Sequence, residues 1–169
     1  MQTEPQPSGA FELIIRPLQN HEEACVGAKL IVESEPWITL GRGFDHSLSL
    51  LTDASKEVYI AQANKIFAGL IVINMQGPFA GYIQAIVVVS ENRNRGIGAR
   101  LIKFAEERIF RESPNVFLCV SGFNTRARQF YTRLGYEPIG ELKDYVIAGA
   151  SEILMRKTIG PKEEFKPRS

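Results

Sequence analysis

The sequence predicts one domain of the α+β (α/β) class, with a mixed sheet that is mostly antiparallel. Three runs rich in Val and Ile, at residues 58–63, 66–73 and 82–89, are separated by connections of hairpin length, which predicts antiparallel pairing. A helical segment separates the third run from a further apolar run at residues 116–120. Because such a crossover joins parallel strands, the sheet also contains one parallel pair. The length of 169 residues, 44% of them hydrophobic and 23% charged, fits a single globular domain with a sizeable core.

The elements of the N-terminal part follow from local signals. Residues 1–10 are polar and contain two prolines, so we expect a disordered tail before a strand at residues 11–15. Asn20 precedes two glutamates and an apolar series, which predicts a helix that is capped by Asn20 and ends near residue 33. A second short helix is expected at residues 44–51.

The spacing of the apolar residues becomes helical at Ile97, and one face of this helix is apolar while the opposite face is charged. The apolar face consists of Ile97, Leu101, Phe104, Ala105 and Ile109. The remaining elements are a strand at residues 116–120, a helix at 125–134 ended by Gly135, strands at 136–142 and 153–158, and a polar tail at 159–169. The domain is therefore expected to span residues 11–158.

The charges are balanced overall but divided along the chain. Twenty Lys and Arg residues oppose nineteen Asp and Glu residues, and this net charge of +1 argues against a protein that binds nucleic acid or a membrane surface. Residues 20–57 contain seven acidic and three basic residues, whereas residues 91–133 contain four acidic and nine basic ones. The second segment therefore suits an anionic ligand.

The cysteines and histidines form no recognisable disulfide or metal pattern. Cys25 and Cys119 are far apart in the sequence, as expected for free thiols in a reducing compartment. His21 and His46 have no partner at the spacing of a metal site or a catalytic triad, so no metal is expected. The N-terminus lacks the features of a signal peptide, and no apolar run approaches the length of about 18 residues that crosses a membrane. We therefore expect a cytoplasmic protein.

The most informative segment is residues 93–100, Arg-Asn-Arg-Gly-Ile-Gly-Ala-Arg, between an apolar strand and an amphipathic helix. Its glycines let a ligand approach the backbone, and the amides and dipole at the helix start favour an anion. It lacks the Gly-Lys-Ser/Thr of a Walker loop, and Leu101 stands where a dinucleotide fingerprint has its third glycine. The glycines alone also fit a tight strand–helix turn, but the arginines favour a multiply charged phosphate ligand.

This Arg-x-x-Gly-x-Gly loop after an apolar strand resembles the acyl-CoA-binding motif of the GNAT superfamily of N-acetyltransferases. A second block, at residues 120–136, resembles that family's strand followed by Asn-x-x-Ala and Phe-Tyr-x-x-x-Gly-Phe/Tyr. The resemblance follows the order of elements over residues 11–158 and is specific over residues 82–100 and 116–139. It implies a GNAT-like sheet, with the parallel pair splayed at the cofactor site and about four flanking helices. It also implies acetyl-CoA as the co-substrate.

Transferred to this sequence by position, the resemblance implies a set of cofactor-binding residues. Backbone groups of Ile86, Val87 and Val88 are expected to pair with the pantetheine arm as an added strand does. Asn124 corresponds to the asparagine that contacts the cofactor arm. The pyrophosphate is expected at the loop, on Arg93, Asn94, Arg95, Gly96, Ile97, Gly98 and Ala99.

The resemblance also implies the catalytic residue. Tyr131 corresponds to the tyrosine that protonates the departing thiolate, although it also fits the apolar face of its helix as one more packed aromatic. An amide at or beside Val87 is expected to stabilise the oxyanion. Many family members have a glutamate at the position of Gln84 or of Cys119, and neither residue present here is an effective base. The sequence therefore assigns no base, and leaves open a water chain, an acid from the N-terminal helices, or an amine of low pKa.

The acceptor side of the cleft is expected near residues 33–37, Glu-Ser-Glu-Pro-Trp. This region lines the acceptor cleft in the superfamily, and the Pro-Trp pair resembles one in ribosomal-protein N-terminal acetyltransferases. Trp37, the only tryptophan, either walls the acceptor pocket or packs under the second helix. Glu33 and Glu35 either attract a cationic amine or are solvated charges at a helix end.

The function implied is an N-acetyltransferase, an acyltransferase that transfers the acetyl group of acetyl-CoA to a primary amine of a small molecule or a protein. The amine would attack directly in a ternary complex. The alternative is a non-catalytic acyl-CoA-binding sensor or scaffold, which the missing carboxylates favour and Tyr131 opposes. Because the acidic segment falls on the acceptor side, the expected acceptor is neutral to cationic. Neither nucleic acid nor a membrane is expected as a partner, and the sequence is compatible with a monomer or a homodimer.

Overall fold

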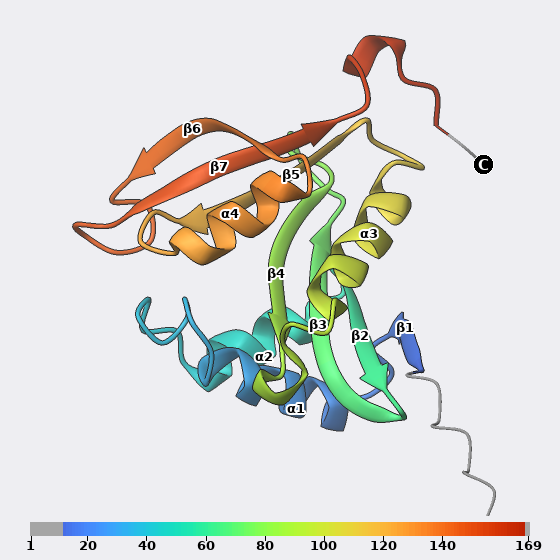
Figure 1. Cartoon of the computed structure of the whole chain (residues 1–169), viewed down its shortest axis with the longest axis vertical. Helices are drawn as coiled ribbons and strands as arrows, with labels where there is room; N and C mark the ends of the chain where they lie inside the picture. Colours follow the sequence, from blue (N-terminus) through green and yellow to red (C-terminus); the bar gives the residue numbers. More distant parts are fainter. Residues whose placement is uncertain (1–11, 168–169) are drawn as a thin grey trace, which may run out of the picture.

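The computed structural model describes residues 12–167, which form a seven-stranded sheet flanked by helices on both faces (Figure 1). The strands are β1 (Leu13–Pro17), β2 (Glu57–Ala63), β3 (Ile66–Asn74), β4 (Tyr82–Val88), β5 (Asn115–Ser121), β6 (Glu137–Lys143) and β7 (Ser151–Thr158). The α-helices are α1 (His21–Val32), α2 (Phe44–Thr52), α3 (Ile97–Ile109) and α4 (Thr125–Arg133), and the short 3₁₀ helices are η1 (Ser90–Asn92) and η2 (Lys162–Glu164). The expected tail at residues 1–10 lies outside the described residues, and η2 lies within the expected C-terminal tail.

The sheet is mixed, with the strand order β1-β2-β3-β4-β5-β7-β6. Strands β1 to β4 pair antiparallel with one another, β4 and β5 are parallel, and β5, β7 and β6 are again antiparallel. The predicted hairpins and the predicted parallel pair are therefore confirmed. The two halves of the sheet diverge where β4 and β5 meet (Figure 1).

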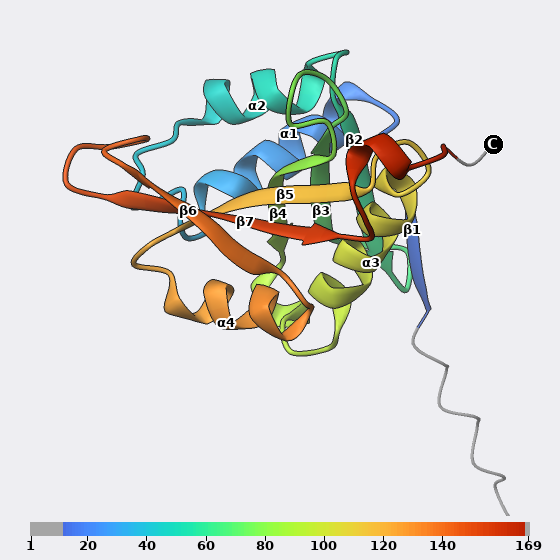
Figure 2. The same cartoon turned by 90° about the horizontal axis from the view of Figure 1, so that it is seen from above.

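Helices α1 and α2 cover one face of the sheet (Figure 2). The carboxamide Oδ1 of Asn20 accepts a hydrogen bond of 2.9 Å from the amide of Glu23, so the predicted N-cap of α1 is confirmed. Small side chains of α1, Ala24 and Ala28, are fully buried and let the helix approach the sheet closely. Both alanines belong to a buried apolar cluster that also includes Leu51 from α2 and apolar side chains of β2, β3 and β4.

Helices α3 and α4 cover the opposite face (Figure 2). Four of the five residues of the predicted apolar face of α3 are at most 1% exposed, namely Ile97, Leu101, Ala105 and Ile109. The fifth, Phe104, is half-buried, and its ring packs edge-on against that of Tyr59, with 4.7 Å between the centroids. The buried face of α3 therefore fixes where its first turn lies relative to the sheet.

Strand β1 starts and ends about two residues later than expected. It continues through Pro17, which is opposite Tyr59 on β2. Proline has no amide hydrogen to donate. Because β1 is at the edge of the sheet, an amide that points away from β2 has no partner strand, so a proline there costs no ladder hydrogen bond. Apolar spacing alone could not indicate this end, since it depends on the strand's place in the sheet.

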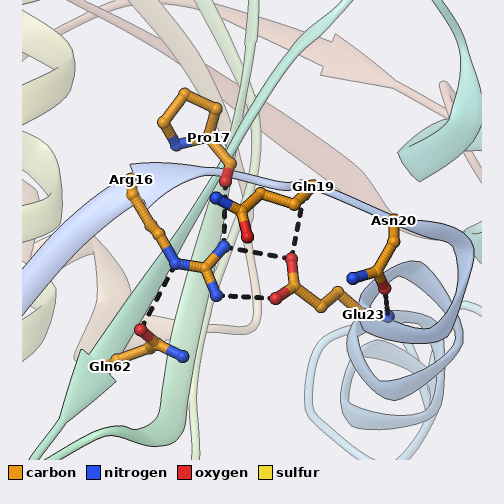
Figure 3. A network of polar contacts seen from close by, with 6 residues as sticks. All are labelled: Arg16, Pro17, Gln19, Asn20, Glu23 and Gln62. Carbon is orange, nitrogen blue, oxygen red and sulfur yellow. Dashed lines mark hydrogen bonds and ion pairs between the residues drawn. The ribbon is translucent and has the colours of Figure 1, made fainter.

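The connection from β1 to α1 is held by a polar network (Figure 3). The Arg16 guanidinium donates two hydrogen bonds to the carboxylate of Glu23, of 2.6 and 3.1 Å, and its Nε donates to Gln62 on β2. The backbone amide of Gln19 donates a hydrogen bond of 2.9 Å to the same carboxylate. The hydrogen bond from Arg16 is the main cause that lowers the pKa of Glu23 below its usual value. The network fixes the entry of α1 onto the sheet.

The strand β7 begins at Ser151, two residues before the expected start, and lies between β5 and β6. Its register places Glu152 opposite Ser121 at the end of β5. Strand β6 is exposed along most of its length and is the other edge of the sheet. A glutamate therefore lies inside the sheet next to the point where β4 and β5 diverge.

Candidate active site

The loop between β4 and α3 turns sharply and presents the start of α3. Asn94 and Gly96 both have positive φ, 61° and 78°, and Gly96 is the residue before the first turn of the helix. The amides of Ile97, Gly98 and Ala99 are in this first turn, where no intrahelical acceptor exists for them. Together with the helix dipole, they form a site that favours an anion.

Arginine side chains surround this helix start. The Nε of Arg93 donates a hydrogen bond of 3.2 Å to the carbonyl of Val88, at the end of β4. The guanidinium of Arg126, at the start of α4, donates a hydrogen bond of 2.8 Å to Oδ1 of Asn94. Arg133, at the end of α4, is on the same side. Three cations, one from the loop and two from α4, thus line the pocket that contains the anion site, which suits a ligand with several phosphate charges.

These elements enclose a pocket of about 520 Å³, which we call the loop pocket. The cofactor-binding residues expected from the sequence line it, with one exception. The exception is Arg95, whose Nη1 donates a hydrogen bond of 3.3 Å to Oδ1 of Asn92. The lining residues among those expected are Ile86, Val87, Val88, Arg93, Asn94, Gly96, Ile97, Gly98, Ala99 and Asn124. The structure therefore brings the two sequence motifs together in one pocket.

The loop pocket continues along β4 because β4 and β5 separate early. Their parallel ladder has two pairs among the described residues, Tyr82 with Phe117 and Ile83 with Leu118. Beyond Ile83, β4 remains paired to β3 on its other side as far as Val88. The backbone of β4 thus faces the pocket with one edge that β5 does not cover, and an extended ligand arm can add to such an edge.

Asn124 lies at the junction of β5 and α4. Its Oδ1 accepts a hydrogen bond of 3.1 Å from the amide of Ala127, so its carboxamide caps α4. The residue lines the loop pocket at the same time. Its capping role gives one physical reason for an asparagine there, and its contact with a cofactor arm stays a prediction.

Tyr131 is on the inner face of α4 and is 8% exposed. Its ring packs edge-on against Phe130, at 5.2 Å between centroids, and against Tyr136, at 5.9 Å. Burial raises the pKa of the Tyr131 phenol above its usual value, so the hydroxyl keeps its proton at neutral pH. The residue is therefore a packed aromatic that also lines the loop pocket, and its role as a proton donor stays a prediction.

A second cavity of about 150 Å³, the strand pocket, lies between the diverging ends of β4 and β5. Its lining includes Gln84, Cys119 and Ser121 from the strands and Trp37 from the segment after α1. The strand pocket shares five lining residues with the loop pocket, which are Glu35, Ile86, Asn124, Ala127 and Tyr131. The two pockets thus meet at these five residues, one of which is Tyr131.

Of the three acceptor-side residues named from the sequence, Trp37 and Glu35 line this second cavity, whereas Glu33, the C-cap of α1, lines neither pocket. Trp37 is half-buried, packs against the apolar cluster of α1 and α2, and also lines the strand pocket. The two expectations for Trp37 are therefore compatible. The carboxylate of Glu35 accepts hydrogen bonds from the amide and the hydroxyl of Thr39, of 3.3 and 3.0 Å, and Glu35 lines both pockets. Its role toward an amine stays a prediction.

The positions of the missing carboxylates also face the strand pocket. The register between β3 and β4 shifts so that Val72 pairs with Ala85 and Ile73 with Ile83, which leaves Gln84 in a bulge. Burial raises the pKa of the Cys119 thiol, which interacts with the hydroxyl of Tyr82, so the thiol is neutral near pH 7. Neither residue offers a charged base to the pocket.

One polar pair near the pocket was missed by the sequence analysis. Glu152 is 6% exposed, and its Oε1 accepts a hydrogen bond of 2.6 Å from the hydroxyl of Ser121. The apolar run of β7 starts one residue later, at Ile153, so the glutamate looks like part of a solvated turn in the sequence. The only available signal was the alternation of side chains along β7, which would have to be extended two residues before the expected start, to Ser151.

Residues 12–167 contain no group of three or more His, Cys, Asp or Glu side chains that could hold a metal ion. His46 interacts with the guanidinium of Arg42 across 2.9 Å. Both cysteines are free thiols. Among the described helices, none is long and apolar enough to cross a membrane.

Comparison of the sequence with models of protein families agrees with the fold and the loop pocket. The model of the acetyltransferase (GNAT) family matches residues 20–136, and the chain belongs to this family. No curated protein matches the sequence.

Solved structures give the same fold at low sequence identity. The chain is similar over 88% of its length to the whole of a GNAT-family structure from Desulfovibrio desulfuricans, with a TM-score of 0.75 and 19% identity. An aminoglycoside 6′-N-acetyltransferase in complex with coenzyme A matches over 88% of this chain and 98% of its own, with a TM-score of 0.69 and 21% identity. A spermidine N-acetyltransferase from Vibrio cholerae matches over 86% and 93%, with a TM-score of 0.68 and 17% identity. These likenesses establish the GNAT fold that the sequence predicted.

Proposed function

We propose that this chain is an N-acetyltransferase that transfers the acetyl group of acetyl-CoA to a primary amine by direct attack in a ternary complex. The observation that carries the proposal is the junction of the loop pocket and the strand pocket at Tyr131. A reaction of two substrates needs two sites that meet at the reacting atoms, with a proton donor at the meeting point. The shared lining of the two pockets, which includes Tyr131, supports the proposal.

Acetyl-CoA is assigned to the loop pocket. Its pyrophosphate suits the amides at the start of α3 and the guanidinium groups of Arg93, Arg126 and Arg133. Its pantetheine arm suits the uncovered edge of β4 beyond Ile83, where amide groups can pair with amide groups. This orientation lets the thioester approach Tyr131, which lines the same pocket.

The chemistry requires a nucleophile, an oxyanion site and an acid. A neutral amine in the strand pocket attacks the carbonyl carbon, and the developing negative charge on oxygen is stabilised by a β4 amide at or beside Val87. As the C–S bond breaks, the sulfur takes the proton of the Tyr131 hydroxyl, which burial keeps protonated. General acid catalysis of this kind contributes about 10² to 10⁴ in rate.

The acceptor is assigned to amines that are neutral to cationic. Glu35 lies at the junction of the pockets, and the segment that supplies Trp37 belongs to the acidic part of the chain, residues 20–57. The likeness to aminoglycoside and spermidine acetyltransferases supports an amine acceptor of this kind. A carboxylate-rich acceptor does not suit such surroundings.

The test is calorimetric binding of acetyl-CoA followed by release of CoA thiol with a panel of spermidine, an aminoglycoside and a peptide with a free N-terminal amine. We expect binding of acetyl-CoA and turnover with at least one amine. Tyr131→Phe should lower kcat about 100-fold and leave the Kd of acetyl-CoA within about twofold, because the phenyl ring keeps the packing. Absence of acetyl-CoA binding, or full kcat in Tyr131→Phe, would contradict the proposal.

A second candidate function is an acyl-CoA-binding sensor or scaffold without catalysis. The observation that favours it is the absence of a carboxylate at Gln84 and Cys119, the two strand positions that face the acceptor side. The same panel distinguishes the two functions. A sensor binds acetyl-CoA and releases no thiol with any amine, whereas an enzyme releases thiol in an amine-dependent and Tyr131-dependent way.

A further inference from the structure

Glu152 is a carboxylate buried beside the strand pocket. Strand β7 places it opposite Ser121, and it is 6% exposed while Ser121 is 1% exposed. The hydroxyl of Ser121 donates a hydrogen bond of 2.6 Å to Oε1 of Glu152, a short distance typical of a bond to a charged acceptor. A buried carboxylate costs stability unless it is hydrogen-bonded, so this pair needs a physical reason to be there.

The alternation of β5 directs this pair toward the acceptor side. Leu118 and Val120 pack into the apolar cluster under α3. Side chains alternate along a strand, so Cys119 and Ser121 point to the opposite face, the face that α1 and α2 cover. Both line the strand pocket together with Trp37. The Ser121 hydroxyl therefore connects the strand pocket, where the amine is proposed to bind, to Glu152 behind it.

We infer that Ser121 and Glu152 form a proton relay that accepts the proton of the attacking amine. Ser121 is the residue that contacts the amine, and Glu152 is a positioning residue that acts through the Ser121 hydroxyl. The inference rests on the proposed function and adds the base that Gln84 and Cys119 do not supply.

With this relay, every proton and bond of the acetyl transfer is accounted for. The amine nitrogen forms a bond to the carbonyl carbon, the C–S bond breaks, and the sulfur takes a proton from Tyr131. The surplus proton on nitrogen passes to Oγ of Ser121 while the Ser121 hydroxyl proton passes to Oε1 of Glu152. Glu152 becomes a neutral carboxylic acid and then releases this proton to solvent, and Tyr131 recovers one from solvent. No other reactant is required.

Other titratable groups surround the relay. Glu152 interacts electrostatically with Tyr82 on β4 and with Cys119 on β5, and Tyr82 interacts in turn with Tyr145 in the β6–β7 connection. Burial raises the pKa of both Tyr82 and Cys119, so both stay neutral in the range where a carboxylate titrates. On β6 the partner of Glu152 is the apolar Leu142, with Glu141 and Lys143 beside it in sequence. Glu35 is a second carboxylate that lines the strand pocket, so the variants below are compared with the natural chain at each pH.

The test compares Glu152→Gln with Glu137→Gln, a matched change on the exposed part of β6. The amine is whichever of spermidine, the aminoglycoside and the peptide gives the highest turnover with the natural chain. We expect Glu152→Gln to lower kcat about 100-fold near pH 8 while the Kd of acetyl-CoA changes by less than about twofold. Glu137→Gln should leave both constants unchanged. Unchanged kcat in Glu152→Gln would overturn the inference.

The pH profile separates a relay from a merely structural role. In the natural chain Glu152 loses its ability to accept a proton once it is protonated, so its advantage over Glu152→Gln should shrink as the pH falls. A role in packing that does not depend on the charge would lower kcat by the same factor at every pH, and a constant ratio would overturn the relay.

Ser121→Ala provides the second variant and covers the case that Glu152→Gln does not fold. We expect it to lose kcat by a similar factor with the same pH-dependent ratio, and the double variant to lose no more than either single one, because the two residues act as one chain. Full activity of Ser121→Ala would overturn the relay. If the natural chain releases no CoA with any amine, the proposed function fails and the relay with it. If the natural chain turns over and both variants match it, only the relay fails.

Discussion

The guanidinium of Arg126 donates a hydrogen bond of 2.8 Å to the side-chain oxygen of Asn94 and so joins the start of α4 to the loop before α3. These residues belong to the two sequence blocks that resemble the GNAT motifs, which are separated by more than one element of the fold. Asn94 has a positive φ, a conformation that asparagine adopts more readily than most residues, and its side chain is left to accept from Arg126. The pair therefore holds the anion site at a fixed position relative to Tyr131 on the same helix.

We predict that Arg126→Ala raises the Kd of acetyl-CoA about tenfold, because it removes one cation from the loop pocket and releases Asn94. The midpoint of urea unfolding should stay nearly unchanged, since Arg126 is exposed. Arg128→Ala is the control, because Arg128 is exposed on the same helix and does not line the loop pocket. Calorimetric titration checks both variants, and equal affinities would contradict the assigned role.

A second prediction concerns Gly96, whose φ of 78° is costly for any residue with a side chain. A Cβ there meets no atom within 4 Å, so the cost of Gly96→Ala is conformational, about 1 kcal/mol of unfolding free energy. Because the loop relieves the strain by moving the amides of the first turn of α3, the Kd of acetyl-CoA should rise at least tenfold.

Gly149→Ala is a matched control for this change. Gly149 has almost the same φ, 79°, and equally open surroundings, but lies in the β6–β7 connection. Its substitution should cost a similar unfolding free energy and leave the affinity for acetyl-CoA as it is. If both variants bind acetyl-CoA equally, the amides of the loop do not hold the ligand.

Much of this site could be predicted because its signals are local. A strand followed by a glycine-containing loop and a helix start defines the anion site within residues 82–100, and the Asn20 cap and the hairpins are equally local. The class of the fold followed from the lengths of the connections, because a hairpin allows antiparallel pairing and a helical crossover imposes parallel pairing.

The features that the sequence did not predict depend on contacts between distant segments. The order β5-β7-β6 places Glu152 beside Ser121, 31 positions earlier in the chain, and no local pattern encodes that register. Arg95 has the same local signal as Arg93, yet the turn at Asn94 and Gly96 directs the two arginines differently. The direction of a loop side chain depends on backbone angles that residue types alone do not specify.

The third prediction uses the network of Glu23. The carboxylate interacts with Arg16 at 2.6 Å, and its pKa is lower in the folded chain than its usual value of 4.5. A lowered folded pKa means that the contribution to stability is present above the usual pKa and is lost as the pH falls through the folded pKa. We predict that Glu23→Gln lowers the urea midpoint at neutral pH, and that this difference from the natural chain shrinks below about pH 4.

Glu22→Gln is the control for this change, since Glu22 is exposed in the same first turn of α1. It removes the same charge near the helix N-terminus without touching Arg16. Urea unfolding followed by circular dichroism at neutral and acidic pH measures both variants. Equal effects of the two substitutions would mean that the helix dipole, and not the contact with Arg16, accounts for the stabilisation.

The last prediction concerns Trp37, the only tryptophan and a wall of the strand pocket. Because the indole is half-buried, its emission depends on whether water or a ligand fills the cavity beside it. An acceptor amine that supports turnover should therefore shift the emission in a saturable way with a midpoint near its KM. Trp37→Ala should raise that KM about tenfold and leave the Kd of acetyl-CoA within about twofold, because the loop pocket lies beyond Tyr131. Ile38→Ala, at an adjacent residue that is 54% exposed, should change neither constant. An unchanged KM in Trp37→Ala would mean that the amine reaches the thioester from a side other than the strand pocket, which would also remove Ser121 from its path.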